Sequence, residues 1–445
     1  MGRKPKLQKD WMHTPKGTRD ILGIDYLYQK DAYLKAENIA SFYGFSPIQT
    51  PLIEKEQLFT ATLGETSDIV EKQMYTIKTR GGDRLVLRPE GTASVMRAYL
   101  EHGMHTLPQP VMFQYKGSFF RHENPQHGRF REFNSFGLEI LGENDSFADA
   151  LTIVVSSLIL KELGIENIIA RINTLGDKEC APSYKKDLTF YLRKKANYLC
   201  KDCKRRLKLN PLRVLDCKEE KCGEIKQNAP QMINYMCEAC KEHFKNLLET
   251  LDSAKVPYLI DHYLVRGLDY YSKTVFEIFL NDEENEQNNN EESAEKKAVM
   301  PNFAIASGGR YDYLSSILSN KDVPGVGGAI GIDRVVDILK NKEAKLKFPN
   351  KPPKIFLVQL GMMAKRKSLN LIEDFRKANI QVAQYLIKDN MKSQLRTASK
   401  MRVAFSLILG QKEALDETVI VRDMNSGSQE IVSISEVVNY IKKRI

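Results

Sequence analysis

The residues best suited to chemistry lie in one stretch, residues 119–139, which reads FFRHENPQHGRFREFNSFGLE. It carries Arg121, Arg129 and Arg131 around a polar centre that contains a proline and a glycine. Strand-like runs on both sides predict an antiparallel hairpin with a long loop, because proline and glycine are typical of turns. Arginine binds phosphate oxygens in pairs, and an aromatic face stacks on a flat base. The stretch therefore suits a nucleotide, although a hairpin whose charges only keep the protein soluble would have a similar composition.

The part FRHENPQHGRFREF resembles motif 2 of the class II aminoacyl-tRNA synthetases, in the form found in the histidyl-tRNA synthetase family. Four further segments resemble that family in the expected order. RPEGTA at 88–93 resembles the segment that holds the α-amino group of the substrate. LVRGLDYY at 264–271 and SGGRYDYL at 307–314 resemble the two histidine-specific signatures. GVGGAIGIDRVVDIL at 325–339 resembles motif 3, and its glycines let the backbone come close to a nucleotide.

The elements that must position these residues also follow the order of the family. A helix over 21–43 and an extended, proline-bearing piece over 44–54 resemble motif 1, which forms the dimer interface in that family. The resemblance implies an α+β fold, with an antiparallel class II sheet flanked by helices in a catalytic domain over 1–345. From the residue pattern we predict that 264–271 is a strand and that 307–314 opens a helix. We also expect Thr92 to cap the helix that follows it.

Three other segments differ in composition from this catalytic part. Residues 177–256 are helical in pattern, basic and cysteine-bearing, which predicts an insertion. Residues 281–298 are polar and acidic, which predicts a flexible loop. After a Lys- and Pro-rich linker at 341–353, residues 354–445 alternate strands and helices, as a small α/β domain does. These last residues hold 16 Lys and Arg against 9 Asp and Glu, a formal charge of +7, and the resemblance implies that they bind the anticodon.

The resemblance implies an aminoacyl-tRNA ligase that works in two steps. Histidine and ATP, with Mg²⁺ on the phosphates, give histidyl-adenylate and pyrophosphate, and the histidyl group then passes to the 3′ end of tRNA(His). The first step brings two anions together, so the site must supply positive charge. By resemblance, Arg121 bridges the carboxylate and the α-phosphate, Arg266 stabilises the pentavalent phosphate from the other side, and Arg334 binds the γ-phosphate. The other matching residues are Glu123 and Phe133 at adenine, and Glu90, Thr92, Ser135, Glu139, Tyr270 and Tyr271 around histidine.

Two departures from the family pattern bear on the substrates. Ser135 stands where the family usually has glutamine, and the shorter side chain needs a water molecule to reach the ligand amine. Asn124 stands where some relatives carry arginine in the loop that faces tRNA. A ligase for another amino acid is therefore one alternative. A non-enzymatic sensor of histidine or tRNA is another, and the presence of all three phosphate-binding arginines favours the enzyme over it.

All seven cysteines lie within one stretch of 61 residues, which points away from disulfides and toward metal. Two CxxC pairs stand out: Cys200 with Cys203, and Cys237 with Cys240. Two such pairs can close one tetrahedral zinc site, so we predict a structural zinc ion at these four residues. Cys217 and Cys222 are alternatives for one of the pairs, and Cys180 is expected to be unpaired. A set of free thiols in a helical insert is the remaining alternative.

Charge and hydropathy limit which partners and which cellular compartment we expect for the protein. The 445 residues have a formal net charge of +10 and a pI near 9.0, which favours an anionic partner. No apolar run is long enough to cross a bilayer, and the basic N-terminus lacks the apolar segment of a secretory signal. We therefore expect a cytoplasmic protein that binds no membrane. The resemblance implies a homodimer that binds tRNA(His), histidine and ATP.

Overall fold

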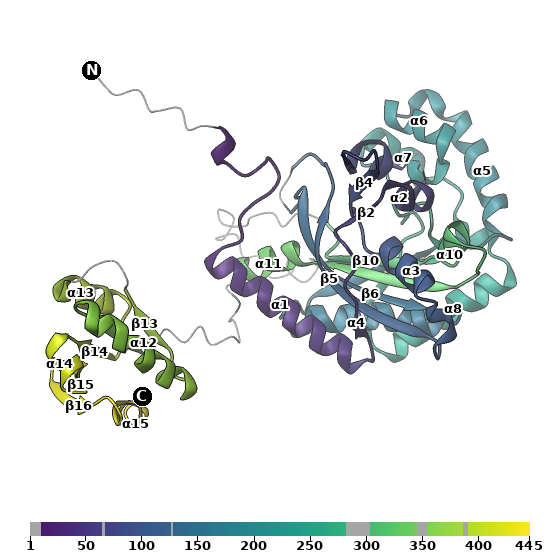
Figure 1. Ribbon diagram of the computed structural model, residues 1–445. Coiled ribbons are helices and arrows are strands. Elements are labelled where there is room, and N and C mark those ends of the chain that lie inside the picture. Colours follow the sequence, from purple (N-terminus) through teal and green to yellow (C-terminus); the bar gives the residue numbers. More distant parts are fainter. Residues whose placement is uncertain are drawn as a thin grey trace, which may run out of the picture. The chain divides into compact units, whose positions relative to one another are not determined.

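The computed structural model describes residues 10–64, 67–125, 128–281, 303–342, 344, 354–385 and 390–445. The chain forms two compact units, Met1–Lys347 and Phe348–Ile445 (Figure 1). The predicted acidic loop at 281–298 lies outside the described residues except for Asn281, and so does most of the linker at 341–353.

A sheet of eight strands, counted within the described residues, forms the centre of the first unit. In spatial order its strands are β1 (Ser46–Pro47), β5 (Val111–Phe120), β6 (Glu132–Leu141), β11 (Gly325–Gly331), β10 (Ala306–Arg310), β9 (Ser272–Leu280), β7 (Ile168–Thr174) and β8 (Tyr258–Ile260). Neighbouring strands run antiparallel except at the two edges, where β1 pairs with β5 and β8 pairs with β7 in parallel. The predicted antiparallel sheet flanked by helices is confirmed.

Helices build the main core on this sheet. α4 (Ser146–Glu162) begins where the Asp145 carboxylate accepts a hydrogen bond of 2.7 Å from the backbone N–H of Phe147, which caps the helix. Most of the apolar side chains of α4 are buried, because the sheet lies on one side and other helices on the next. The neighbouring helices are α1 (Gly23–Phe42) and α8 (Glu238–Ser253), which contact α4, and α11 (Ile332–Asn341), which contacts α1.

A second apolar core joins the strand β5 to a small antiparallel sheet and three helices. Tyr115 and Phe119 of β5 are buried in this core, together with Tyr99 of α3. Its elements are β2 (Ile53–Lys55), β3 (Tyr75–Lys78), β4 (Arg84–Leu87), α2 (Glu56–Leu63), α3 (Thr92–Glu101) and α10 (Leu314–Leu318).

Two of the predicted elements are wrong. Residues 264–271 form no strand but a loop, and the Asn173 amide donates to the backbone carbonyl of Leu264 at 2.9 Å, where a strand partner would otherwise be needed. Ser307 to Arg310 lie on β10 and do not open a helix. Glycine is required there because a Cβ at Gly308 would lie 2.1 Å from the carbonyl oxygen of Gly327 on the neighbouring strand.

Between β7 and β8 the chain leaves the sheet and forms a mainly helical insertion, residues 175–257, which we call the excursion. Its helices are α5 (Ala181–Lys194), α6 (Lys201–Leu209) and α7 (Glu220–Gln227), followed by α8, which returns to the main core. Leu188 and Leu192 lie in a separate small core, and four buried cysteines are part of it. The excursion is therefore held by its own packing rather than by the sheet.

The second unit is an α/β sheet, with strands in the order β13 (Val382–Gln384), β12 (Ile355–Gln359), β14 (Phe405–Leu409), β15 (Thr418–Asp423) and β16 (Gln429–Ser433). Its helices are α12 (Met362–Lys377), α13 (Met391–Lys400), α14 (Gln411–Leu415) and α15 (Val437–Lys442). The strand β16 was not predicted, because most of it is exposed at the sheet edge and its sequence lacks an apolar run. In the described part of the chain, no helix has both the length and the apolar character needed to cross a membrane.

Candidate active site

A cavity of about 190 Å³ lies over the strands β5, β6 and β11. Five segments that are far apart in the sequence line it: 89–92, the hairpin of β5 and β6, 266–271, 304–307 and motif 3. Ten of the eleven predicted site residues face this one cavity: Glu90, Thr92, Arg121, Glu123, Phe133, Ser135, Arg266, Tyr270, Tyr271 and Arg334. The structure therefore brings together motifs that the sequence separates by more than 200 residues.

Two of the arginines are held in place by backbone carbonyl groups. Arg121 Nε donates to the carbonyl of Pro89 at 2.9 Å, and its guanidinium lies 5.3 Å from the ring centre of Phe133. Arg334 Nε donates to the carbonyl of Gly128 at 3.2 Å. Burial, and next the positive charge of Arg129, lower the pKa of Arg334 to about 10. The lowered pKa reflects mainly the loss of water around the guanidinium, and the neighbouring Arg129 adds positive charge that an anionic ligand would compensate.

Arg266 reaches the cavity from the loop at 264–271. It pairs with the carboxylate of Glu277 on β9 and donates to the hydroxyl of Ser307 on β10 at 2.8 Å. Burial acts to lower the pKa of Arg266, but Glu277 together with Tyr271 and Tyr270 outweighs it, and the pKa is raised. The guanidinium therefore stays charged although it is buried, and two neighbouring strands fix its position.

Glu139 is the one residue predicted to bind histidine or ATP that is not among the described residues lining the cavity. It is fully buried behind it and accepts hydrogen bonds from the hydroxyls of Thr92 at 2.7 Å, Tyr115 at 3.2 Å and Tyr311. Burial raises the pKa of Glu139 to about 8. Only glycine leaves room for this carboxylate, because a Cβ at Gly327 would lie 1.7 Å from Glu139 Oε2.

The predicted capping role of Thr92 is wrong, because Glu90 performs it. The Glu90 carboxylate accepts from the backbone N–H groups of Thr92 at 2.6 Å and Ala93 at 2.9 Å, at the start of α3. The Thr92 hydroxyl donates to Glu139 instead. Burial raises the pKa of Glu90, while the two N–H donors act to lower it.

Two family models match the sequence. The model described as Histidyl-tRNA synthetase matches residues 17–335, and the one described as Anticodon binding domain matches residues 354–444. The first match alone covers well over half of the chain. The chain belongs to the histidyl-tRNA synthetase family.

Relatives and solved structures agree with this assignment to the histidyl-tRNA synthetases. Histidine–tRNA ligase of Desulforamulus reducens is 38% identical over 433 residues, which are 97% of this chain and 99% of the relative. That of Dehalococcoides mccartyi is 39% identical over 432 residues, again 97% and 99% of the two chains. The structure of apo histidyl-tRNA synthetase from S. aureus, 28% identical, superposes with a TM-score of 0.76 over 97% of this chain and 99% of that one.

A further solved structure shares the fold alone. It is a Bacillus halodurans protein described as an ATP phosphoribosyltransferase regulatory subunit/histidyl-tRNA synthetase, 20% identical with a TM-score of 0.62 over 91% of this chain and 99% of that chain. The fold by itself therefore does not separate a ligase from a regulatory protein, and the residues of the cavity must do so.

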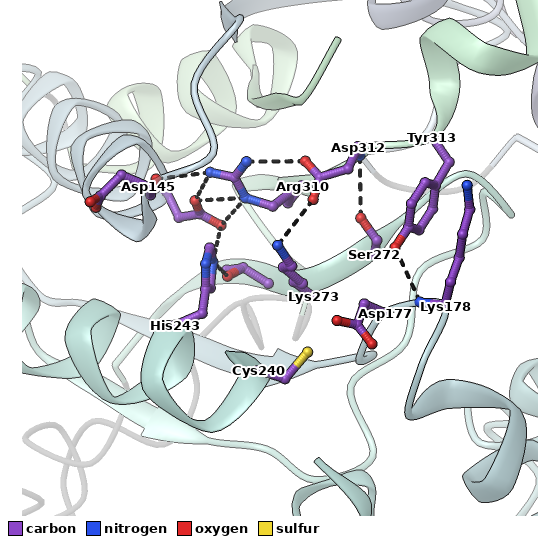
Figure 2. A network of polar contacts seen from close by, with 12 residues as sticks. Asp145, Asp177, Lys178, Cys240, His243, Ser272, Lys273, Arg310, Asp312 and Tyr313 are labelled. Carbon is purple, nitrogen blue, oxygen red and sulfur yellow. Dashed lines mark hydrogen bonds and ion pairs between the residues drawn. The ribbon is translucent and has the colours of Figure 1, made fainter. Parts of the chain in front are cut away.

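In this histidyl-tRNA synthetase, Arg310 of the second signature lies in a buried polar network and not in the cavity (Figure 2). Its guanidinium donates from Nε to Asp149 Oδ2 at 3.0 Å and from one terminal nitrogen to Asp312 Oδ1 at 3.0 Å. The other terminal nitrogen donates to the carbonyl of Asp145 at 3.0 Å. His243 Nε2 of α8 lies 3.4 Å from Asp149 Oδ1. The network therefore joins β10 to α4 and α8.

Sequence reasoning missed several residues that support the synthetase site. Tyr115 and Tyr311 hold Glu139, and the signal for Tyr311 was its place directly after Arg310 in a recognised motif. Tyr115 had no such signal, because only the pairing of β5 with β6 brings it to Glu139. Arg19 was missed as well: it pairs with Asp333 of motif 3 at 2.8 Å, and its guanidinium lies 4.0 Å from the ring centre of Phe130.

The structure corrects the predicted zinc site. The two CxxC pairs lie in different clusters: Cys200, Cys203, Cys217 and Cys222 in one, and Asp177, Cys180, Cys237 and Cys240 in the other. The first pair starts α6 in the excursion and the second starts α8, whose body lies in the main core, so their spacing in sequence says nothing about their distance. Cys180, expected to be unpaired, belongs to the second cluster. None of these cysteines is among the described residues that line the cavity.

Proposed function

We propose that this protein is a histidine–tRNA ligase. It joins the carboxylate of histidine to the α-phosphate of ATP, which breaks the bond to the β-phosphate and releases pyrophosphate. The histidyl group of the adenylate then passes to the 3′-terminal hydroxyl of tRNA(His). Mg²⁺ enters with ATP as part of the substrate, bound mainly to phosphate oxygens and water.

The observation that carries this proposal is the combination of two chemistries in one cavity. Arg121, Arg266 and Arg334 reach it from three different segments, and a buried carboxylate with three hydroxyl donors lies behind it. Three fixed guanidinium groups suit a triphosphate and the extra negative charge of a pentavalent phosphorus. A buried carboxylate suits the N–H of an imidazole ring.

In the first step, each arginine has a separate part. Arg121 would bridge the carboxylate of histidine and the α-phosphate, because the carbonyl of Pro89 and the ring of Phe133 hold it beside the base-stacking position. Arg266 would stabilise the pentavalent phosphate from the other side. Arg334 would bind the γ-phosphate, because it lines the cavity close to Arg129, whose positive charge an anion would also compensate. Phe133 would stack on adenine, with Glu123 at the amino edge of the base.

Histidine would be bound by the remaining residues of the cavity. Glu90 would hold the α-amino group, together with Thr92 and Tyr270, and Ser135 would reach that group through water. Tyr271 and Glu139 would face the two nitrogens of the imidazole ring. Glu139 acts from behind Gly327, so its reach into the cavity depends on the absence of a side chain at that glycine.

We assign the proposed partners separately to the two units of the chain. The catalytic domain would span residues 1–345, with the insertion at 177–256, and residues 354–445 would bind the anticodon of tRNA(His). A homodimer is supported by apolar side chains exposed around motif 1, of which Phe42 is 87%, Leu52 49% and Ile53 47% exposed. Sedimentation should give twice the chain mass of 50.9 kDa, and a monomer would contradict this part. A cytoplasmic location is part of this proposal, because histidine, ATP and tRNA are the substrates that the reaction would use.

Amino-acid-dependent exchange of pyrophosphate into ATP tests the proposal. We expect exchange with histidine alone among the twenty amino acids, and a loss of about 10²–10³-fold in Arg266→Ala. Arg171→Ala is the matched control, because Arg171, on the strand β7, is also an arginine paired with an acid, Asp261, but does not line the cavity. The melting temperature of each variant shows whether it is folded.

Three outcomes would contradict the proposal in different ways. No exchange with any amino acid, from folded wild-type protein, would favour the sensor. Exchange with another amino acid would favour a ligase of different specificity. Full exchange in folded Arg266→Ala would leave the assignment as a ligase intact but would show that Arg266 does not stabilise the reacting phosphate.

A further inference from the structure

The two sulfur-bearing clusters of the excursion both have the composition of a metal site. In each, four ligand atoms from four side chains lie within 4.8 Å of one another. The first offers four thiolates, from Cys200, Cys203, Cys217 and Cys222, and the second offers three thiolates and the carboxylate of Asp177. We propose that the chain binds two structural zinc ions, one in the tetrathiolate cluster inside the excursion and one in the aspartate cluster at its base.

The distances between the ligand atoms fit zinc. Zinc–sulfur bonds of about 2.3 Å in a tetrahedron place two sulfurs about 3.8 Å apart. Cys200 Sγ and Cys217 Sγ are 3.9 Å apart, and Cys180 Sγ and Cys240 Sγ are 3.7 Å apart. With zinc–oxygen bonds of about 2.0 Å, a sulfur and an oxygen lie about 3.5 Å apart. Asp177 Oδ1 lies 3.3 Å from Cys180 Sγ and 3.8 Å from Cys237 Sγ.

The same distances exclude disulfides, whose sulfurs lie about 2.05 Å apart. All seven cysteines are free in this structure. Every cysteine of the sequence belongs to one of the two clusters, and none is left over. A core that only needed small apolar side chains would not require cysteine at seven positions, and the rest of the chain uses none.

Backbone N–H groups point at the sulfur atoms, as they do around metal-bound thiolates. Cys203 N donates to Cys200 Sγ at 3.4 Å, and Cys200 N donates to Cys222 Sγ at 3.4 Å. In the second cluster, Asp177 N donates to Cys180 Sγ at 3.4 Å.

The aspartate cluster lies where the chain leaves β7 and where it enters the helix α8. Asp177 and Cys180 follow β7, and Cys237 and Cys240 start α8, which runs back to β8. Lys178, beside Asp177, donates its backbone N–H to the hydroxyl of Tyr313 at 3.1 Å (Figure 2). A zinc ion here would join the start of the excursion to the start of α8 and hold them against the segment that carries Tyr311, which contacts Glu139. The tetrathiolate ion would instead stabilise only the small core of the excursion.

The first measurement is the zinc content of the untagged full chain by mass spectrometry of the elements. We expect two zinc ions per chain after dialysis against metal-free buffer. A mercurial that modifies thiols should release both ions in the presence of a zinc-binding dye. Zero or one ion per chain, in protein that shows seven free thiols after denaturation, would overturn the proposal. None of these readouts depends on ligase activity, so they stand or fall separately from the proposed function.

Variants separate the two sites. We expect one zinc ion per chain both in Cys217→Ser and in Cys237→Ser, since each replaces a half-buried ligand of one cluster and spares the other. Asp177→Asn should weaken the second site without removing a thiol. Cys180→Ser is the deciding variant, because it should lose one ion if Cys180 is a ligand. Two ions in folded Cys180→Ser, or loss of both ions in either single-cluster variant that still melts like the wild type, would overturn the two-site arrangement.

Discussion

The fold keeps the carboxyl group of Glu139 protonated at pH values at which an exposed glutamate is ionised. Its pKa of about 8 in the folded protein lies far above the value of about 4.3 for an exposed glutamate. Between these two values the folded protein keeps a proton that the unfolded chain releases. The contribution of this group to stability is therefore complete below about pH 4.3, and it is lost as the pH rises toward 8, at about 1.4 kcal/mol per pH unit.

We expect Glu139→Gln to remove this dependence, since glutamine keeps the shape of the side chain and has no charge to suppress. Calorimetry of both proteins at pH 6 and pH 7.5 would measure it. The midpoint temperature of the wild type, minus that of the variant, should fall as the pH rises. A difference that stays constant would mean that Glu139 titrates normally in the fold.

Ser135 tests whether the histidine pocket has room for a longer polar side chain. We expect Ser135→Gln to lower the KM for histidine by about 2–10-fold, the effect of one direct hydrogen bond of 0.5–1.5 kcal/mol in place of a water-mediated one. The KM for ATP should stay within a factor of two. A raised KM for histidine would show that this pocket is shaped around serine.

At the scale of elements, the ion pair of Arg310 and Asp149 joins the strand β10 to the helix α4. Both side chains are fully buried, so removal of one partner leaves an uncompensated charge. We expect Arg310→Met to destabilise the protein by about 3–5 kcal/mol in urea unfolding. The double variant Arg310→Met with Asp149→Leu should recover a large part of this loss, because it removes the buried Asp149 charge with its partner, while Asp312 keeps Lys273 at 3.4 Å. Equal losses in the single and double variants would show that the pairing itself holds the elements together.

The elements predicted well from sequence were those with a local signal. The hairpin of β5 and β6 was predicted because its turn residues and arginines are contiguous, and β11 with α11 because glycines precede a periodic helix. The loop at 264–271 was mistaken for a strand because its residues have strong strand propensity. Tyr270 and Tyr271 are adjacent and yet line the same cavity, which side chains that alternate along a strand cannot do.

The candidate site was predictable where motifs name residues, and hidden where long-range pairing makes contacts. Ten of the eleven predicted residues share the cavity because the recognised motifs carry them. Glu277 had no such signal, since its partner, Arg266, reaches it through tertiary packing. The predicted grouping of the cysteines was wrong for the same reason, because spacing along the chain does not give the distance between the starts of two helices.

At the scale of the whole molecule, the second unit should bind tRNA mainly through its charge. Residues 354–445 of this unit carry a formal charge of +7, and each phosphate contact lowers the logarithm of affinity by about 0.7–0.9 for every tenfold rise in salt. We expect the KM for tRNA(His) in aminoacylation to rise steeply between 50 and 200 mM KCl. The KM for histidine in pyrophosphate exchange should change little and serves as the control. A KM for tRNA that ignores salt would contradict electrostatic binding.

In the excursion, the helices α5 to α7 leave after β7 and return at the start of α8 close to one point, where Cys180 Sγ and Cys240 Sγ are 3.7 Å apart. Its first three helices have a core of their own, and the strands on either side pair directly with each other. A segment with adjacent ends adds length to the chain without stretching the scaffold, and its loop-closure cost grows only slowly with length. Residues could therefore be added to, removed from or exchanged in the excursion during evolution without a change in the strand register of the catalytic sheet.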